Sequence, residues 1–221
     1  MKREHGDWDF QTLDLMPEPK KVKTKGEFTT CILPPPLDPN KPTLVLDMDN
    51  TLIHAREGKA TLRLFSGKVV PLERYMVAKR PGVDEFLRDM AKLYEIVVFT
   101  AAMQYYADKI LDKLDPEGLI THRLYRDSCV SCDGGETMIK DLSRLGRDLK
   151  RVVIVDDNPH SFSLQPRNGI PIPAFKNRKG RKYSHLKDIG FFLETFAKAE
   201  DLTRALDIAK TKRYRKICKI F

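Results

Sequence analysis

The chain has 221 residues, a length that suits one full domain and is short for two. Hydrophobic residues make up 41% of it, which is enough for a packed core and excludes a wholly disordered protein. The four cysteines are too few for a disulfide scaffold. No apolar run approaches the roughly 18 residues of a membrane-spanning helix, and the N-terminus lacks the apolar core of a secretory signal. We therefore expect a soluble intracellular protein without a membrane anchor.

Lysine and arginine number 40 against 31 aspartate and glutamate residues, which gives a formal net charge of +9. The excess lies in three runs, Pro19–Lys25, Lys176–Lys182 and Lys210–Lys219. Each run is compatible with a solvated face or tail. The alternatives are a nuclear import signal in the first run and a patch for acidic partners in the others. Aromatic residues do not interleave with these runs, so nucleic acid is not an expected partner. We expect a nuclear or cytoplasmic location, with the nucleus favoured.

The sequence patterns, taken from the N-terminus to the C-terminus, indicate a leader, one α/β domain and a tail. Residues 1–40 lack a sustained apolar period and contain several prolines, which predicts a flexible leader. Short buried strands then alternate with amphipathic helices through residues 41–200, and partly alternating runs at about 60–79 predict a small antiparallel insert. Strands are expected at 43–46, 96–99, 152–155 and 170–173, and helices at 83–94, 103–114, 140–146 and 186–196. This order predicts a Rossmann-like parallel sheet with helices on both faces. Residues 201–221 are predicted to be a basic helix on the domain or a basic tail.

Polar side chains follow three of the predicted strands. In open α/β sheets, ligands bind outside the carboxyl ends of the strands, so these side chains mark the expected site. They are Asp47, Asp49 and Thr51 after the first strand, Thr100 after the second, and Asp156 and Asp157 after the third, with Lys140 nearby in sequence.

Four carboxylates at one sheet edge repel one another unless cations compensate them. Lys140 supplies one positive charge, and a divalent ion would supply the rest. Oxygen ligands suit Mg²⁺, whereas Zn²⁺ favours His or Cys ligands, which these strand ends lack. The sequence thus predicts a site for Mg²⁺ and a phosphoryl group.

The Asp-x-Asp spacing allows two carboxylates to point the same way at a strand end. Asp47 is then the predicted nucleophile, forming an aspartyl-phosphate, and Asp49 the general acid and base. Thr100 and Lys140 are expected to hold the non-bridging phosphate oxygens. The alternative for Asp47 and Asp49 alone is a role as loop or N-cap residues, which aspartate also favours.

These motifs are similar to those of a known family. The segment LVLDMDNTLIHA resembles the DxDxT signature of the protein-phosphatase branch of the haloacid dehalogenase superfamily. The segments KRPGVDEFL, VVFTAAMQYYAD, RDSC, KDLSRLGRDL and VVIVDDNP resemble the small C-terminal-domain phosphatases and their Dullard-like relatives. The resemblance runs from about Thr43 to Phe196. It implies Mg²⁺-dependent removal of phosphate from serine or threonine in proteins, possibly in the repeat tail of RNA polymerase II.

The resemblance also implies a role for each matched residue. Asp47 would be nucleophile and metal ligand, and Asp49 would be the acid/base and would bind the metal through its backbone carbonyl. Asp157 would be the third metal ligand. Because successive residues at a strand end face opposite ways, we expect Asp156 to support Lys140 from behind, and Thr51 is expected in a similar supporting role. The implied phosphate-binding residues are Thr100 and Lys140, and the implied substrate-binding residues are Arg126, Tyr106 and Met103.

Two segments depart from the family pattern: the loop from Cys129 to Lys140 is longer, and the insert before Lys79 is shorter. Such a small insert would leave the cleft open, which suits a phosphorylated tail or loop of a protein. Two other functions stay open at this point, a phosphatase acting on nucleic-acid ends and a non-catalytic adaptor that binds phosphopeptides. A monomer is expected.

Overall fold

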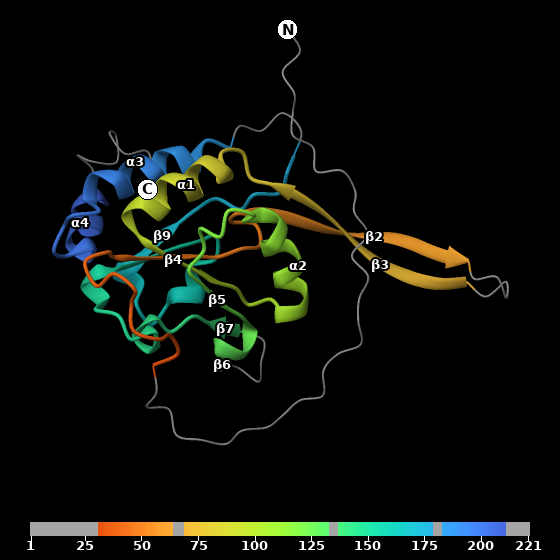
Figure 1. Cartoon of the computed structure of the whole chain (residues 1–221), viewed down its shortest axis with the longest axis horizontal. Helices are drawn as coiled ribbons and strands as arrows, with labels where there is room; N and C mark the ends of the chain where they lie inside the picture. Colours follow the sequence, from red (N-terminus) through yellow and green to blue (C-terminus); the bar gives the residue numbers. More distant parts are fainter. Residues whose placement is uncertain (1–30, 64–68, 133–136, 179–182, 211–221) are drawn as a thin grey trace, which may run out of the picture.

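A computed structural model describes residues 31–63, 69–132, 137–178 and 183–210 of the chain (Figure 1). The first basic run, Pro19–Lys25, lies outside the described residues, as do residues 179–182 and 211–221. Within the described part, no helix is long and apolar enough to cross a membrane.

A five-stranded parallel sheet forms the centre of the molecule, as predicted. Its strands run in the order β5-β4-β1-β8-β9. They span Thr43–Leu46 (β1), Glu95–Phe99 (β4), His122–Leu124 (β5), Val152–Asp156 (β8) and Gly169–Pro171 (β9). The chain leaves β1 towards β4 on one side and reaches β8 on the other, so β1 lies at the topological switch point. A ligand crevice is expected outside the carboxyl end of this strand.

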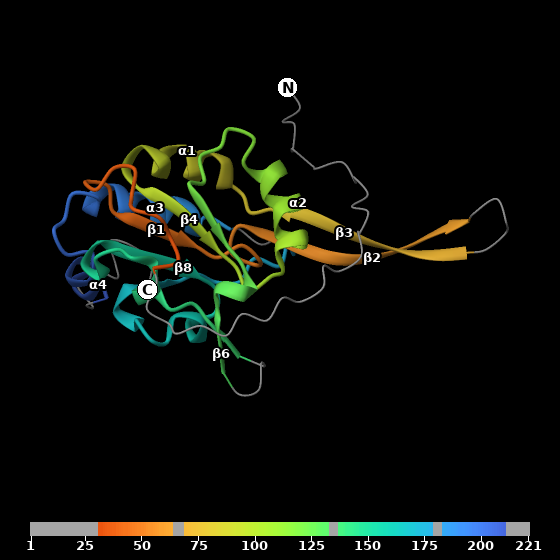
Figure 2. The ribbon, with the colours of Figure 1, turned by 60° about the horizontal axis from the view of Figure 1, so that its bottom comes forward.

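The alternation of side chains along the strands divides the core between the two faces of the sheet. Leu44 and Leu46 of β1 join one apolar cluster, whereas Val45 between them joins the other. All four α-helices of the described residues contribute to the first cluster: α1 (Val83–Leu93), α2 (Gln104–Leu114), α3 (His185–Phe196) and α4 (Leu202–Ala209). Figure 2 shows α1 on one side of β1, β4 and β8, with short helical turns on the opposite side.

The second face differs from the expectation of a regular helix over residues 140–146. Short 3-10 helices lie there instead, at Leu142–Leu145, Leu149–Arg151, Pro159–Phe162 and Pro166–Asn168, with another at Arg126–Ser128. The Asp141 side chain caps the first of them, and Gly146 ends it in a left-handed conformation (φ 69°). A segment bounded so closely is too short for an α-helix to propagate. Leu142 and Leu145 nevertheless cover the sheet as a helix face would.

The predicted insert is a long antiparallel hairpin that projects from the body (Figures 1 and 2). Its strands are β2 (Ile53–Arg63) and β3 (Val69–Lys79), so pairing begins at Ile53 rather than near residue 60. A smaller antiparallel pair, β6 (Val130–Cys132) and β7 (Thr137–Ile139), occupies the long loop before Lys140. The main hairpin therefore rises directly from the loop that carries the Asp-x-Asp motif.

Segments at both ends of the described chain pack on the domain. Leu33, which falls within the expected leader, is buried in the second core cluster, and the backbone N–H of Ile32 donates to the Arg144 carbonyl at 2.8 Å. At the other end, α4 buries Leu202, Ala205, Leu206 and Ala209 in the first cluster. Of the two alternatives for the C-terminal region, residues 202–209 form a packed helix.

Replacing the fully buried Leu206 by alanine should destabilise the protein by about 2–5 kcal/mol, because it removes apolar contacts and leaves a cavity. Urea denaturation measures this change. Arg204→Ala, on the exposed face of the same helix, is the control and should change the free energy of unfolding by less than about 0.5 kcal/mol. Equal, small effects of both changes would show that α4 is not part of the folded unit.

Candidate active site

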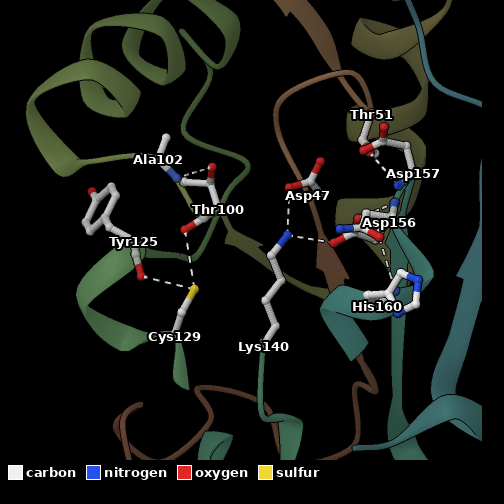
Figure 3. A network of polar contacts seen from close by, with 11 residues as sticks. Asp47, Thr51, Thr100, Ala102, Tyr125, Cys129, Lys140, Asp156, Asp157 and His160 are labelled. Atoms are coloured by element: carbon white, nitrogen blue, oxygen red, sulfur yellow. Dashed lines mark hydrogen bonds and ion pairs between the residues drawn. The ribbon is translucent and has the colours of Figure 1, made fainter. Parts of the chain in front are cut away.

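A buried lysine joins two carboxylates at the carboxyl edge of the sheet (Figure 3). Lys140 Nζ donates to Asp47 Oδ1 at 2.6 Å and to Asp156 Oδ2 at 2.7 Å. Asp47 follows β1, and Asp156 ends the neighbouring β8, so parallel pairing brings the two carboxylates together. Lys140 itself leaves β7, and its backbone N–H donates to the Ser161 carbonyl at 2.6 Å.

The electrostatics keep Lys140 charged although it is fully buried. Burial alone would lower the pKa of this ammonium group, but the carboxylates of Asp47 and Asp156 more than offset burial and raise it. Removing either partner would leave an uncompensated buried charge, which costs far more than a surface ion pair contributes. The three side chains therefore form one electrostatic unit.

One oxygen of Asp47 is left without a partner in this unit. Asp47 Oδ2 is buried and accepts no hydrogen bond among the described residues. Asp47, Asp156 and Asp157 each place a carboxylate oxygen within 4.8 Å of the others. Residues 47–52, between β1 and β2, carry the Asp-x-Asp motif and are called the motif loop. The Asp157 backbone N–H donates to Thr51 Oγ1 at 3.1 Å, which holds the end of β8 against this loop. An oxygen-only set with an unpaired buried carboxylate oxygen fits a hard cation such as Mg²⁺.

Asp49 lies beside this cluster in a different environment. Burial, with a further contribution from the charge of Asp47, raises its pKa to about 6, although the hydroxyl of Tyr106 donates to Asp49 Oδ1 at 3.0 Å and opposes the shift. The pKa of Asp157 is also raised to about 6, by burial and by the carboxylates of Asp47 and Asp156. Carboxyl groups with such pKa values can exchange protons near neutral pH.

Thr100 reaches the site from the other neighbour of β1. It follows β4, is buried, and accepts a hydrogen bond from the Ala102 backbone N–H on Oγ1 at 3.0 Å. Its own hydroxyl proton is thus available to a ligand oxygen. In Figure 3, Thr100 lies on one side of Lys140 and the pair Asp156–Asp157 on the other. The sequence-predicted residues of three strand ends therefore converge on one space.

The three predicted substrate-binding residues lie on the α2 side of the site. Met103 precedes α2 and has 42% of its surface exposed, while Tyr106 packs edge-on against Tyr75 of the hairpin with ring centroids 4.9 Å apart. Arg126 is exposed, and its Nε donates to the Ala101 carbonyl at 2.7 Å. Of these three residues, Tyr106 alone has a hydrogen bond to a predicted catalytic side chain, and its contact with Tyr75 links the hairpin to α2.

Sequence reasoning missed Arg80, which is completely buried beneath the motif loop. Its guanidinium donates to the carbonyls of Thr51 (2.5 Å), Asn50 (2.8 Å) and Pro173 (2.7 Å). The preceding and following residues, Lys79 and Pro81, suggested only the start of a helix. An arginine placed immediately before Pro-Gly at the end of a strand carries no signal of its burial, because the carbonyls that it binds come from distant segments.

The fold and the arrangement of these residues define an α/β domain with an acidic, lysine-supported site at the carboxyl edge of its parallel sheet. Comparison with protein families is consistent with this class. The model of the NLI interacting factor-like phosphatase family matches residues 42–203, and the chain belongs to that family. The resemblance inferred from the sequence motifs is thereby confirmed.

Individual relatives extend the comparison. The chain is 43% identical over 171 residues to the probable C-terminal domain small phosphatase of Dictyostelium discoideum, covering 75% of this chain and 54% of the relative. It is 38% identical over 175 residues to the human carboxy-terminal domain RNA polymerase II polypeptide A small phosphatase 1, covering 76% and 64%. It is also 41% identical over 159 residues to the mitochondrial import inner membrane translocase subunit TIM50 of Phytophthora infestans, covering 72% and 35%. The chain thus spans between about a third and two thirds of the length of these relatives.

The raised pKa of Asp49 predicts that Asp49→Asn stabilises the protein at pH 7.5 in EDTA. In the folded state this carboxyl keeps its proton up to about pH 6, whereas in the unfolded chain it loses it near pH 4. The folded state binds more protons in that interval, so this group makes stability fall as pH rises from 4 to 6. The variant should gain about 2–3 kcal/mol over the wild type at pH 7.5 and little at pH 4, measured by urea denaturation.

Asp89→Asn, on the exposed side of α1, is the control and should change stability by less than about 0.5 kcal/mol at pH 7.5. A loss of stability in Asp49→Asn that is the same at both pH values would contradict a raised pKa of the Asp49 carboxyl group.

Proposed function

We propose that the protein is a Mg²⁺-dependent serine/threonine phosphatase that acts on phosphoproteins through an aspartyl-phosphate at Asp47. The observation that carries the proposal is how the two carboxylate oxygens of Asp47 are bonded. One of its carboxylate oxygens is held by the buried Lys140 at 2.6 Å, and the other is buried without a partner beside Asp157. A loop or N-cap aspartate would instead use its oxygens on nearby backbone N–H groups.

Each site residue has a role in the proposed first step. A carboxylate oxygen of Asp47 attacks phosphorus, the bond from phosphorus to the seryl or threonyl oxygen breaks, and its electron pair stays on that oxygen. Asp49, whose pKa of about 6 keeps a useful fraction protonated near neutral pH, delivers a proton to the leaving oxygen. The Lys140 ammonium and the Thr100 hydroxyl stabilise charge on the non-bridging oxygens.

In the second step a water molecule attacks the phosphorus of the aspartyl-phosphate. Asp49, now ionised, accepts a proton from that water, and the bond between phosphorus and the Asp47 oxygen breaks. Inorganic phosphate leaves, and both aspartates return to their starting forms. Tyr106 supports both proton transfers by Asp49. Its hydroxyl donates a hydrogen bond to Asp49 Oδ1, which limits the rotation of the carboxyl group.

Mg²⁺ would be held by Asp47, by Asp157 and by the Asp49 backbone carbonyl, with Asp156 and Thr51 behind them as positioning residues. When bound, the ion supplies positive charge against the phosphate oxygens and against the clustered carboxylates. Asp156 fits a supporting role because Lys140 and the Asn158 backbone N–H occupy its two oxygens, at 2.7 and 2.8 Å.

A phosphorylated tail or loop of a protein is the proposed substrate. The names of two matched relatives identify them as phosphatases of a C-terminal domain, one of them that of RNA polymerase II, and this supports the repeat tail of that polymerase as a candidate. A nuclear location would follow from such a substrate. In the described part of the chain, the insert after the Asp-x-Asp motif is a narrow hairpin and not a closing cap domain, which supports a macromolecular substrate. We propose that the protein works as a monomer.

Purified protein should hydrolyse an aryl phosphate with Mg²⁺, and EDTA should abolish the reaction. Asp47→Asn should lower kcat by at least about 10³-fold, because the amide cannot serve as the nucleophile. Circular dichroism and a urea titration must show that the variant is folded.

Turnover that is unaffected by EDTA or by Asp47→Asn would refute the proposed chemistry. Absence of turnover in folded, Mg²⁺-loaded wild type, combined with binding of phosphopeptides, would favour the adaptor. Turnover restricted to oligonucleotide ends, with strongly salt-dependent affinity, would favour the nucleic-acid phosphatase.

A further inference from the structure

The second basic run of the sequence begins beside the motif loop. The segment that leads to it, Pro173–Lys176, is fixed against Asn50, the residue that follows Asp49. The Phe175 backbone N–H donates to the Asn50 carbonyl at 2.7 Å, and the Phe175 side chain is buried. Lys176, the first residue of this run, is therefore an exposed cationic residue at a defined place beside the motif loop.

The buried side chain of Arg80 also holds the Pro173–Lys176 segment in place. Its guanidinium joins the Pro173 carbonyl to those of Asn50 and Thr51 and lies 5.4 Å from the centroid of the Phe175 ring. One buried side chain thus holds the motif loop and the Pro173–Lys176 segment together.

A second exposed cation, Arg56 of the hairpin, meets Lys176 from the other side. Arg56 Nη2 donates to the Lys176 carbonyl at 3.4 Å, and Arg56 Nε donates to His54 Nε2 at 3.3 Å. Because His54 Nε2 accepts, the proton of this ring lies on Nδ1, which donates to Asn50 Oδ1 at 3.0 Å. A hydrogen-bonded chain therefore runs from Arg56 through His54 to the motif loop.

Neither Arg56 nor Lys176 forms an ion pair with a carboxylate among the described residues. This distinguishes them from Arg88, Arg123, Arg147 and Arg167, which all do. The Nη1 group of Arg56 also has no hydrogen-bond acceptor among the described residues, so one side of its fork is available to a ligand. Two exposed cationic residues on segments that touch, neither paired with a described carboxylate, favour an anion with several oxygens, and guanidinium geometry suits phosphate and carboxylate.

The distance from the catalytic aspartates suits a second residue of the same peptide. Ile53 is bridged to Asp49, and Arg56 lies three residues further along β2. Three residues of extended chain span about 10 Å, so a bound extended peptide would bring a residue about three to five positions from its scissile phosphate to this place.

We propose that Arg56 and Lys176 form an anion-binding subsite that selects peptide substrates carrying a second phosphorylated side chain near the one that is hydrolysed. The subsite deepens the proposed phosphatase function and rests on it. His54 and Arg80 are positioning residues here: the first orients the guanidinium of Arg56, and the second fixes the segment that carries Lys176.

The test compares a peptide with one phosphoserine with peptides that carry a second phosphoserine three, four or five residues away on either side. We expect the wild type to show about tenfold higher kcat/KM for at least one doubly phosphorylated peptide, equivalent to 1.4 kcal/mol. In Arg56→Gln/Lys176→Gln this ratio should fall to within about twofold of unity. The ratio is independent of how much general activity each variant keeps.

Lys150→Gln/Lys198→Gln is the matched control, because it removes the same charge from exposed residues at the opposite end of the sheet. This variant should keep the preference. A wild type without any preference overturns the subsite, as does an equal loss in both double variants, which would assign the preference to net charge.

Binding separates failure of the subsite from failure of the proposed chemistry. Fluorescence anisotropy with Asp47→Asn protein measures affinity for the same labelled peptides without turnover. A tighter Kd for the doubly phosphorylated peptide that is lost with Arg56→Gln/Lys176→Gln supports the subsite even if the protein proves not to hydrolyse phosphate. Equal Kd values for singly and doubly phosphorylated peptides overturn it, whatever the enzyme assays show.

Discussion

The site depends on the burial of one ammonium group between two carboxylates. Lys140 is within 2.7 Å of both Asp47 and Asp156, and the strands that supply these aspartates are hydrogen-bonded neighbours. Without the lysine, parallel pairing of β1 and β8 would force two buried negative charges together, which is unfavourable in a medium of low dielectric constant. Since Asp157 and Asp49 add further negative charge when they are ionised, one lysine leaves the edge electronegative. An anionic phosphoryl group can approach such an edge only together with a cation, so the proposed Mg²⁺ would have an electrostatic as well as a chemical purpose.

A second constraint acts on the backbone of the motif loop. Asn50 has a positive φ of 60°, so the chain turns sharply between the Asp-x-Asp motif and the hairpin. The buried guanidinium of Arg80 satisfies the carbonyls that this turn exposes, and Thr51 accepts the Asp157 backbone N–H. Because these hydrogen bonds are already formed in the unliganded protein, ligand binding does not have to order the loop and loses little conformational entropy. They tie the hairpin, the motif loop and the end of β8 into one rigid support.

Much of this arrangement could be predicted from sequence, for a physical reason. Short apolar runs that end in polar residues identify buried parallel strands, and parallel strands bring their carboxyl ends to the same edge. The sequence alone therefore predicts that Asp47, Thr100 and Asp156 lie together. The burial of Arg80, the start of the predicted hairpin as early as Ile53, and the chain from Arg56 through His54 to Asn50 could not. Each depends on contacts between residues distant in sequence, or on a strand that starts where the local pattern still resembles a loop. The expected helix at 140–146 was wrong because the cap at Asp141 and the left-handed Gly146 leave too few residues for an α-helix.

The central claim is that Asp47 becomes phosphorylated during turnover. The most direct measurement is a rapid acid quench of the Mg²⁺-loaded protein in its first turnover, followed by proteolysis and mass spectrometry. We predict a phosphoryl group on the peptide that contains Asp47, stable in acid and released by mild alkali, that appears and decays with the kinetics of turnover. Turnover without phosphorylation of any peptide, or with the phosphoryl group on another residue, would contradict the account.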